Sequence, residues 1–388
     1  MQKGKLMVLG GANCGPTLSG ACYLVEISGF RILLDCGGTK DYHIPPDIPN
    51  PETIDLIYIS HAHVDHIGAL GYIASICPNA RIYMTNLTRM LTQYQLDAII
   101  SDKIGANTPA LRFNNEILVR MIMNRVYTVE ENTEGIAVGK DGAYVRHTFF
   151  KAGHTPGASM ILLEIADADI RKGSRKLLYT GDFADFSTQL TYPYELPKDI
   201  RPDTLILCAT HADQQRKEKD ISYTNATDAA KQAILSEMKP HPKLSMKISS
   251  PLKSLELVGL LYQMEQEKKI PRLPIFMDSA LYTLVTDFVR ISPSIDVSNV
   301  RNIRDFDPRK EKRAFLITSF KNGQYYGTRF DFSIHASYQG LVELIKNTNA
   351  KNVFVVHTPN VPDEEKALAG ECVKSMITYT ENGASYIF

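Results

Sequence analysis

Three histidines and an aspartate fall within six consecutive residues of this chain, in the segment His61-Ala62-His63-Val64-Asp65-His66. The segment directly follows the apolar run Ile54–Ser60, which reads as a buried strand. The end of a buried strand holds side chains rigidly, and imidazole and carboxylate groups bind zinc-like divalent cations. In a chain with only ten histidines, such a pattern arises by chance roughly once in a few thousand proteins of this size. The segment therefore predicts a metal centre at a strand end.

The spacing within this segment divides its ligands between two metals. Alternation places His61 and His63 together for one ion, and Asp65 and His66 can reach a second ion a few ångströms away. Four ligands do not complete two sites, so further His and Asp residues are expected at later strand ends. Three residues that follow apolar runs meet this description: His154, Asp182 and His357. Taken singly, each is more often a turn or core residue than a ligand, but beside the first segment we expect all three to be ligands.

Composition excludes several classes of protein. Lys and Arg number 43, as do Asp and Glu, so a nucleic-acid partner would have to be held by a local basic patch. The six cysteines are scattered without a CxxC pair, which argues against a zinc ribbon or a disulfide framework and indicates a reducing compartment. No apolar run reaches the roughly 18 residues of a membrane span, and no signal peptide is expected. We therefore expect a cytoplasmic protein without a membrane partner, or a nuclear one if the source is eukaryotic.

Strand and helix patterns alternate along the chain, which predicts an α/β fold. Strands are expected at Lys5–Leu9, Ala21–Ile27, Arg31–Asp35, Ile54–Ser60, Arg81–Met84, Ala143–Ala152, Met160–Ile165, Lys176–Tyr179, Thr204–Leu207, Pro274–Met277, Ala314–Ser319 and Val353–Val356. Helices are expected at Ile67–Ile76, Leu87–Ile100, Arg112–Asn124, Asn225–Met238, Leu252–Lys268 and Gln339–Asn347. The charge runs Asp213–Asp220 and Asp307–Arg313 suggest boundaries. We predict one domain in two parts, residues 1–213 and 314–388, interrupted by an inserted α/β lobe of residues 214–313.

Five segments together resemble the metallo-β-lactamase superfamily and, within it, the β-CASP nucleases. Ile59–Leu70 is similar to the signature motif, and Ala152–Ser159 and Leu178–Phe183 are similar to the third and fourth motifs. Ser333-Ile334-His335-Ala336 resembles the β-CASP motif, and Val355-Val356-His357 resembles the last motif. The likeness covers most of the chain and is closest to the pre-mRNA 3′-end processing endonucleases and related bacterial and archaeal ribonucleases. It implies a metallo-β-lactamase αββα sandwich with an inserted, shortened β-CASP lobe.

The resemblance also implies a role for each candidate site residue. His61, His63 and His154 would bind one zinc, Asp65, His66 and His357 the other, and Asp182 would bridge the two beside a bridging hydroxide. Two metals about 3.5–4 Å apart activate water and clamp a phosphate. The expected catalytic residues are Asp65, Asp182 and His335, with His335 as the general acid. Asp35 would orient the ligand loop, and manganese or iron could replace zinc.

Residues that contact the RNA are expected in the lobe and just before His335. Lys253 stands where the family has an Arg, and it would meet a phosphate as a point charge rather than as a fork. Tyr326 could stack a base and Arg329 could hold a phosphate, with Ser333 in the same region. Core packing is the alternative interpretation of Tyr326.

This chain departs from the family pattern in three places. The family's motif A ends a strand with an acid that holds the catalytic histidine, whereas Cys208 occupies that place here. His335 is therefore expected to be less well oriented, with Asp213 as a substitute, and Cys208 is expected to be a packed small residue. The lobe is short, and Thr358-Pro359 replaces the usual Gly-Glu. Of the remaining histidines, His43, His147 and His241 are expected to be surface or structural residues, whereas His211 lies near motif A.

The function that the resemblance implies is a two-zinc phosphodiesterase acting on single-stranded RNA. A DNA-directed nuclease is disfavoured by His357, because that branch usually lacks the last histidine. A small-molecule metallohydrolase is disfavoured by the lobe and the His335 motif. An inactive partner subunit is disfavoured by the presence of all seven ligands, although Cys208 keeps this alternative open. Recruitment to RNA through a protein partner or through a homodimer is a further expectation.

Overall fold

The computed structural model describes residues 3–12, 20–38, 46–101, 116–169, 173–213, 223–248, 251–319, 328–329, 334–358, 361 and 366–388. The chain divides into two compact units. The first comprises residues 1–186, 193–220 and 335–388, and the second comprises residues 187–192 and 221–334. Within the described residues, no helix combines the length and the apolar composition that a membrane crossing requires.

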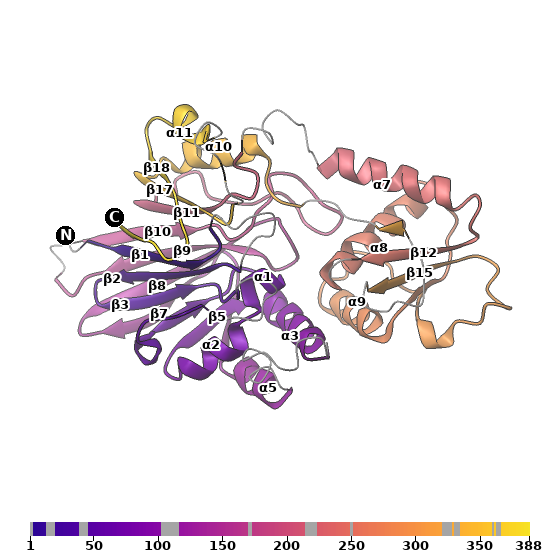
Figure 1. The fold of residues 1–388 in the computed structure, drawn as a ribbon, viewed down its shortest axis with the longest axis horizontal. Coiled ribbons are helices and arrows are strands. Elements are labelled where there is room, and N and C mark those ends of the chain that lie inside the picture. The colour runs from indigo at the N-terminus through magenta and orange to yellow at the C-terminus, as the bar shows by residue number, and fades with distance from the viewer. Residues whose placement is uncertain are drawn as a thin grey trace. The chain divides into compact units, whose positions relative to one another are not determined.

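Two seven-stranded sheets form the first unit (Figure 1). In spatial order, the first sheet contains β19 (Ser385–Ile387), β1 (Lys5–Gly10), β2 (Cys22–Ile27), β3 (Phe30–Leu34), β4 (Leu56–Tyr58), β5 (Arg81–Thr85) and β6 (Val126–Val129). The second contains β18 (Met376–Tyr379), β17 (Asn352–Val356), β11 (Thr204–Cys208), β10 (Ser174–Tyr179), β9 (Ser159–Ala166), β8 (Ala143–Lys151) and β7 (Glu134–Lys140). In each sheet one half is antiparallel and the other parallel, the parallel half running from β3 to β6 and from β10 to β18.

Apolar side chains fill the space between the two sheets. Tyr23 and Tyr58 from the first sheet and Phe149 and Tyr179 from the second are fully buried there. In β1, which lies near the edge of its sheet, buried and partly exposed residues alternate, and the buried ones face the space between the sheets. Every residue of β17 is buried, because the outer face of this strand is also covered.

Helices cover the outer faces of both sheets, which gives four layers. Apolar side chains of α2 (Leu70–Ile76), α3 (Asn86–Ser101) and α5 (Glu116–Asn124) pack on the first sheet. Those of α10 (Tyr338–Thr348) and α11 (Leu368–Glu371) pack on the second. The short helices η2 (Pro51–Thr53) and α1 (Val64–Ile67) lie in the loops around β4. The predicted α/β fold with helix, sheet, sheet and helix layers is confirmed.

The second unit is a parallel sheet with helices. Its spatial strand order is β14 (Val300–Asn302), β13 (Ile275–Met277), β15 (Ala314–Ser319), β12 (Lys243–Ile248) and β16 (Thr328–Arg329). Its helices are α7 (Tyr223–Glu237), α8 (Pro251–Gln266), α9 (Ser279–Ile291) and the short η5 (Ile303–Asp305).

The second unit does not begin and end where the charge runs suggested. We expected residues 314–388 to return to the first domain, but β15 pairs with β12 on one side and β13 on the other. The unit therefore continues to residue 334 and also takes in residues 187–192, instead of spanning 214–313. The physical reason is that the charges at Asp307–Arg313 mark an exposed loop that leads into a central strand, not the edge of a folded unit.

Candidate metal centre

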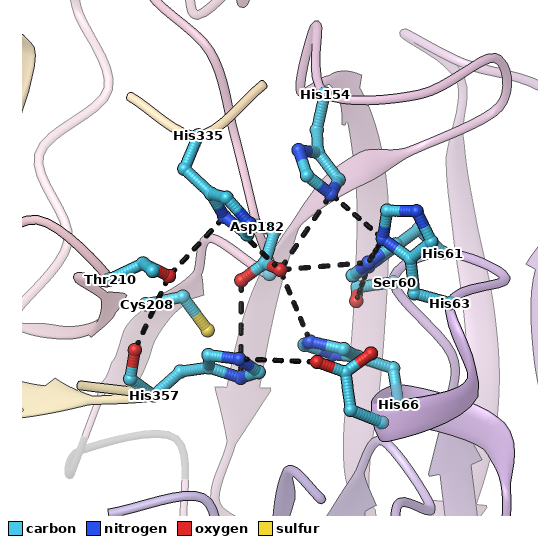
Figure 2. A network of polar contacts seen from close by, with 12 residues as sticks. Ser60, His61, His63, His66, His154, Asp182, Cys208, Thr210, His335 and His357 are labelled. Atoms are coloured by element: carbon cyan, nitrogen blue, oxygen red, sulfur yellow. Dashed lines mark hydrogen bonds and ion pairs between the residues drawn. The ribbon is translucent and has the colours of Figure 1, made fainter. Parts of the chain in front are cut away.

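The predicted ligands converge where strands of the first unit end (Figure 2). His61 and His63 follow β4, His154 follows β8, Asp182 follows β10, and His357 follows β17. Because β10, β11 and β17 are parallel neighbours, their carboxyl ends lie at the same edge of the sheet. Asp65 and His66 reach the cluster from α1, for which His63 is the residue that precedes the first turn.

One group of ligands consists of His61, His63, His154 and Asp182. The Nε2 atoms of His61 and His154 lie 3.1 and 3.0 Å from Nδ1 of His63. Each of the two Nε2 atoms lies 3.7 Å from Oδ2 of Asp182. Ligands of a tetrahedral zinc, at about 2.0–2.1 Å from the ion, are separated by roughly 3.3–3.5 Å. The spacing of these four atoms therefore fits one zinc-sized cation.

A second group consists of Asp65, His66 and His357. Nε2 of His357 lies 3.4 Å from Oδ2 of Asp65, and the rings of His66 and His357 stack with centroids 4.6 Å apart. Asp182 adjoins this group as well, with Oδ2 3.4 Å from His66 Nε2 and Oδ1 4.0 Å from His357 Nδ1. Asp182 thus lies between the two groups and faces both.

Several buried atoms of these ligands have no hydrogen-bond partner within the described part of the chain. They are Oδ1 and Oδ2 of Asp182, Nε2 of His66, and both ring nitrogens of His357. Buried polar atoms without partners are rare in folded proteins because each raises the free energy of the folded state. Here they converge on one another, and their chemistry is that of ligands for divalent cations. The residues present therefore fit a metal centre.

Asp35 orients two of the proposed ligands, His61 and His66. Its carboxylate is fully buried and accepts hydrogen bonds from Ser60 N (2.7 Å), Ser60 Oγ (2.7 Å) and Tyr179 Oη (2.5 Å). Its Oδ2 also lies 2.6 Å from Nδ1 of His66, while Ser60 Oγ lies 3.0 Å from Nδ1 of His61. Holding the Nδ1 side of both rings turns each Nε2 toward the cluster, as supporting carboxylates do at metal sites.

The protonation states of the cluster suit metal binding. Burial lowers the pKa of His61 well below its usual value and that of His63 to about 3, so both imidazoles are neutral. Burial alone would raise the pKa of Asp182, but His357, His66 and His335 hold it well below its usual value. Burial alone would lower the pKa of His66, but Asp182 and Asp35 raise it. A bound cation would take the place of the His66 proton.

His335 lies beside the cluster and is more exposed than the fully buried ligands. Its Nδ1 is 3.5 Å from Oδ2 of Asp182, and its side chain is 24 % exposed, whereas those of His61 and His357 are 0 % exposed. Desolvation by the surrounding protein lowers the pKa of His335 well below its usual value. Because the ring is partly exposed, it can meet a molecule that binds at the cluster, and because its pKa is lowered, the free ring is neutral until it takes up a proton.

Thr210, which we did not predict, is one of the residues that contact His335. Its Oγ1 lies 3.2 Å from Nδ1 of His335 and donates to the carbonyl oxygen of His357 at 3.4 Å. Cys208, two positions earlier, is buried, and its Sγ lies 3.7 Å from the hydroxyl of Tyr179. Burial raises the pKa of Cys208 well above its usual value, so the thiol is protonated in the metal-free chain, where its Sγ lies close to candidate ligand atoms of Asp182 and His357. The only sequence signal for Thr210 was its place just after a strand end.

Other predicted residues lie in the second unit, between the two sheets, or outside the described residues. Lys253 is half-buried in α8 of the second unit. Tyr326 and Ser333 lie outside the described residues, and for Arg329 only its backbone in β16 is described. His147 is buried, with Nδ1 3.0 Å from the hydroxyl of Tyr58, in a structural position between the sheets.

Comparisons with known proteins agree with this fold. Residues 15–207 match the metallo-β-lactamase superfamily, and residues 328–365 match the Zn-dependent metallo-hydrolase RNA specificity domain. A crystal structure of an Enterococcus faecalis protein of unknown function superposes over 100 % of both chains, with a TM-score of 0.62 at 13 % identity, which bears on the fold alone. The chain belongs to the metallo-β-lactamase superfamily.

Named relatives narrow this assignment. Cleavage and polyadenylation specificity factor 73 of Drosophila melanogaster is 29 % identical over 222 residues, 55 % of this chain and 30 % of the relative. Endoribonuclease ysh1 of Aspergillus fumigatus is 29 % identical over 210 residues, which are 52 % of this chain and 22 % of the relative. Transcription termination factor FttA of Methanothermobacter thermautotrophicus is 27 % identical over 278 residues, which are 68 % of this chain and 40 % of the relative. The matched regions span less than half of each relative's length. With the RNA specificity domain, these relatives assign the chain to the β-CASP branch of the superfamily.

Proposed function

We propose that this chain is a two-zinc phosphodiesterase that hydrolyses single-stranded RNA. The observation that carries the proposal is the position of Asp182, whose two oxygens face two separate ligand groups while His335 lies 3.5 Å from one of them. The match to an RNA specificity domain and the relatives named as endoribonucleases support RNA as the substrate.

Two bound zinc ions would supply an activated water and would neutralise charge on the scissile phosphate. His61, His63 and His154 would hold one ion, Asp65, His66 and His357 the other, and Asp182 both; manganese or iron suits the same donor set. Asp35 keeps the rings of His61 and His66 turned toward the ions through Ser60 and through its own carboxylate.

His335 is the residue placed to protonate the leaving oxygen. The Oγ1 of Thr210 donates to the carbonyl of His357, so it accepts the Nδ1 hydrogen of His335. Because the pKa of His335 is lowered, the ring must first take up a proton at Nε2, which the contact with Thr210 leaves free, and Nε2 then donates this proton to the leaving group. The hydroxyl of Thr210 thus contributes to the orientation of His335, beside the carboxylate of Asp182 at 3.5 Å.

The proposal is tested by cleavage of an end-labelled single-stranded RNA and the matching DNA. The wild-type chain and the His335→Ala variant are compared with zinc and with manganese, after elemental analysis has established the metal content. We expect the wild type to cut RNA and the variant to lose at least 100-fold in rate, which is the usual contribution of a general acid. Equal cutting of RNA and DNA would overturn the substrate assignment.

An inactive partner subunit is the second candidate, and the replacement of the motif A acid by buried Cys208 favours it. This alternative predicts that the chain binds RNA but does not cleave it, even when both metals are bound. Recruitment through a protein partner or a homodimer remains a prediction. A reducing compartment, cytoplasm or nucleus, is supported by the five cysteines that the structure describes, which are free and buried.

A further inference from the structure

The loop after Asp182 and the turn that carries His335 are joined by three hydrogen bonds. The backbone N of Ala336 donates to the carbonyl oxygen of Phe183 at 2.6 Å. The backbone N and the Oγ of Ser337 donate to Oδ1 and Oδ2 of Asp185 at 2.8 and 2.5 Å. The first bond connects the residues that directly follow Asp182 and His335. The other two connect Asp185 and Ser337, which come two residues later and one residue later in the same segments.

The carboxylate of Asp185 occupies a place that the first turn of α10 leaves open for it. Ser337 precedes the first turn of α10, and its Oγ accepts a hydrogen bond from the backbone N of Gly340 at 3.0 Å. A Cβ atom at position 340 would lie 2.4 Å from Cγ of Asp185, a distance that only a glycine avoids. Glycine is a poor helix former, so its presence in this turn serves the close approach of the carboxylate. The negative charge is also favourable at a helix N-terminus.

The peptide after His335 is held from its other side by His211. Nδ1 of His211 lies 3.1 Å from the carbonyl oxygen of Ala336 and donates to it. Both backbone polar groups of Ala336 are therefore satisfied, one by the loop after Asp182 and one by the segment after β11. Because the side chain of His335 is 24 % exposed, the position of its ring depends strongly on these hydrogen bonds to the backbone of the next residue.

We propose that Asp185 is a positioning residue, which sets the place of the His335 ring relative to Asp182 by joining their two loops through Ser337. This inference rests on the proposed function, in which His335 donates a proton. A displacement of about 1 Å in a catalytic group can cost about 100-fold in rate. Asp185 bonds Ser337 rather than a metal ligand, so its loss should lower kcat and leave KM and metal content unchanged.

The test compares kcat and KM for RNA cleavage, and zinc content, among four variants. We expect Asp185→Ala to lower kcat about 10- to 100-fold and Ser337→Ala, which removes half of the contact, to lower it about 3- to 10-fold. Asp185→Asn should stay within about threefold of the wild type, because an amide can still bond both Ser337 groups. Asp278→Ala is the matched control: Asp278 caps α9 through a bond from Leu281 N at 3.1 Å, in the second unit.

The results separate positioning from general stabilisation. A kcat for Asp185→Ala equal to that of Asp278→Ala would overturn the inference, as would a change confined to KM or zinc content. If Asp185→Ala does not fold, Ser337→Ala and Asp185→Asn give the same comparison. If the wild type cuts no RNA, the proposed function fails, and the ring NMR signals of His335 decide the positioning separately. These signals, assigned by their loss in His335→Ala, should shift in Asp185→Ala and stay in place in Asp278→Ala; an unchanged spectrum in both would refute the inference.

Discussion

Replacement of Asp35 by Asn should weaken zinc binding although Asp35 is no proposed ligand. Three donors meet Oδ2 of Asp35, from Ser60 Oγ, His66 Nδ1 and Tyr179 Oη, and a fourth, Ser60 N, meets Oδ1. An Asn side chain has one acceptor oxygen, and the backbone N–H of Ser60 can never accept, so the amide oxygen must stay at the Oδ1 position. The amide NH2 then faces Nδ1 of His66, which moves the ring proton to Nε2, the nitrogen turned toward the cluster.

The expected magnitude follows from these contacts. Loss of a supporting contact to a metal-binding histidine typically costs 10- to 100-fold in affinity, about 1.4–2.8 kcal/mol. The metal-free chain should also lose about 3–5 kcal/mol of unfolding free energy, since two or more buried hydrogen bonds to a charged group are broken at about 1.5–3 kcal/mol each. Zinc affinity is measured by competition with a chromophoric chelator, and stability by urea unfolding with excess chelator.

Asp55→Asn is the control for this experiment. Asp55 is a partly buried carboxylate in the same unit that accepts a bond from Arg31 N at 2.9 Å, away from the cluster. It should leave zinc affinity unchanged. If Asp35→Asn loses stability but binds zinc as tightly as the wild type, Asp35 supports the fold alone and the tautomer reasoning is refuted.

Three further predictions concern Asp182, Thr210 and His147. Asp182→Ala should lose bound metal because both ligand groups lose a shared oxygen donor; elemental analysis that still finds two metals per chain would contradict the assignment. Thr210→Val, which keeps the side-chain shape but removes the hydroxyl beside His335, should lower kcat for RNA about 2- to 12-fold, the value of one hydrogen bond, and an unchanged kcat would count against its role. Burial lowers the pKa of His147 from 6.5 to about 4, so the unfolded chain takes up this proton at higher pH than the folded chain. Stability from the neutral ring is complete above about pH 6.5 and is lost as the pH falls toward 4, by up to about 3 kcal/mol. Urea unfolding with chelator from pH 7 to 4 should show a shallower loss for His147→Gln, and parallel curves would show that His147 does not contribute.

The candidate site was predictable where its chemistry is local in the sequence. The segment His61–His66 carries ligand types at a strand end, and the other proposed ligands also follow apolar runs. Thr210 and Asp185 were not predicted, because their partners His335 and Ser337 lie 125 and 152 residues away. A threonine or an aspartate in a loop has no feature in the sequence that indicates such a contact.

The second unit shows the same limit for secondary structure. Helix α9 was not predicted, although Asp278 stands directly before it and accepts from Leu281 N as a helix cap does. Strand β15 was predicted as a strand but assigned to the wrong unit. Its apolar pattern reports that it is buried, and this pattern is the same for whichever sheet a strand joins.

The sequence alone determined the donor types of the candidate site, the strand ends that carry them, and the alternation of buried strands and helices. These properties depend on side-chain chemistry and on periodicity over a few residues. The tertiary structure decided that Asp182 faces both ligand groups, that Asp35 receives four donors, and that the hydroxyl of Thr210 lies beside Nδ1 of His335. Those outcomes depend on which strands pair and how two sheets stack, because residues far apart in the chain meet only when long-range pairing brings their strand ends to one edge.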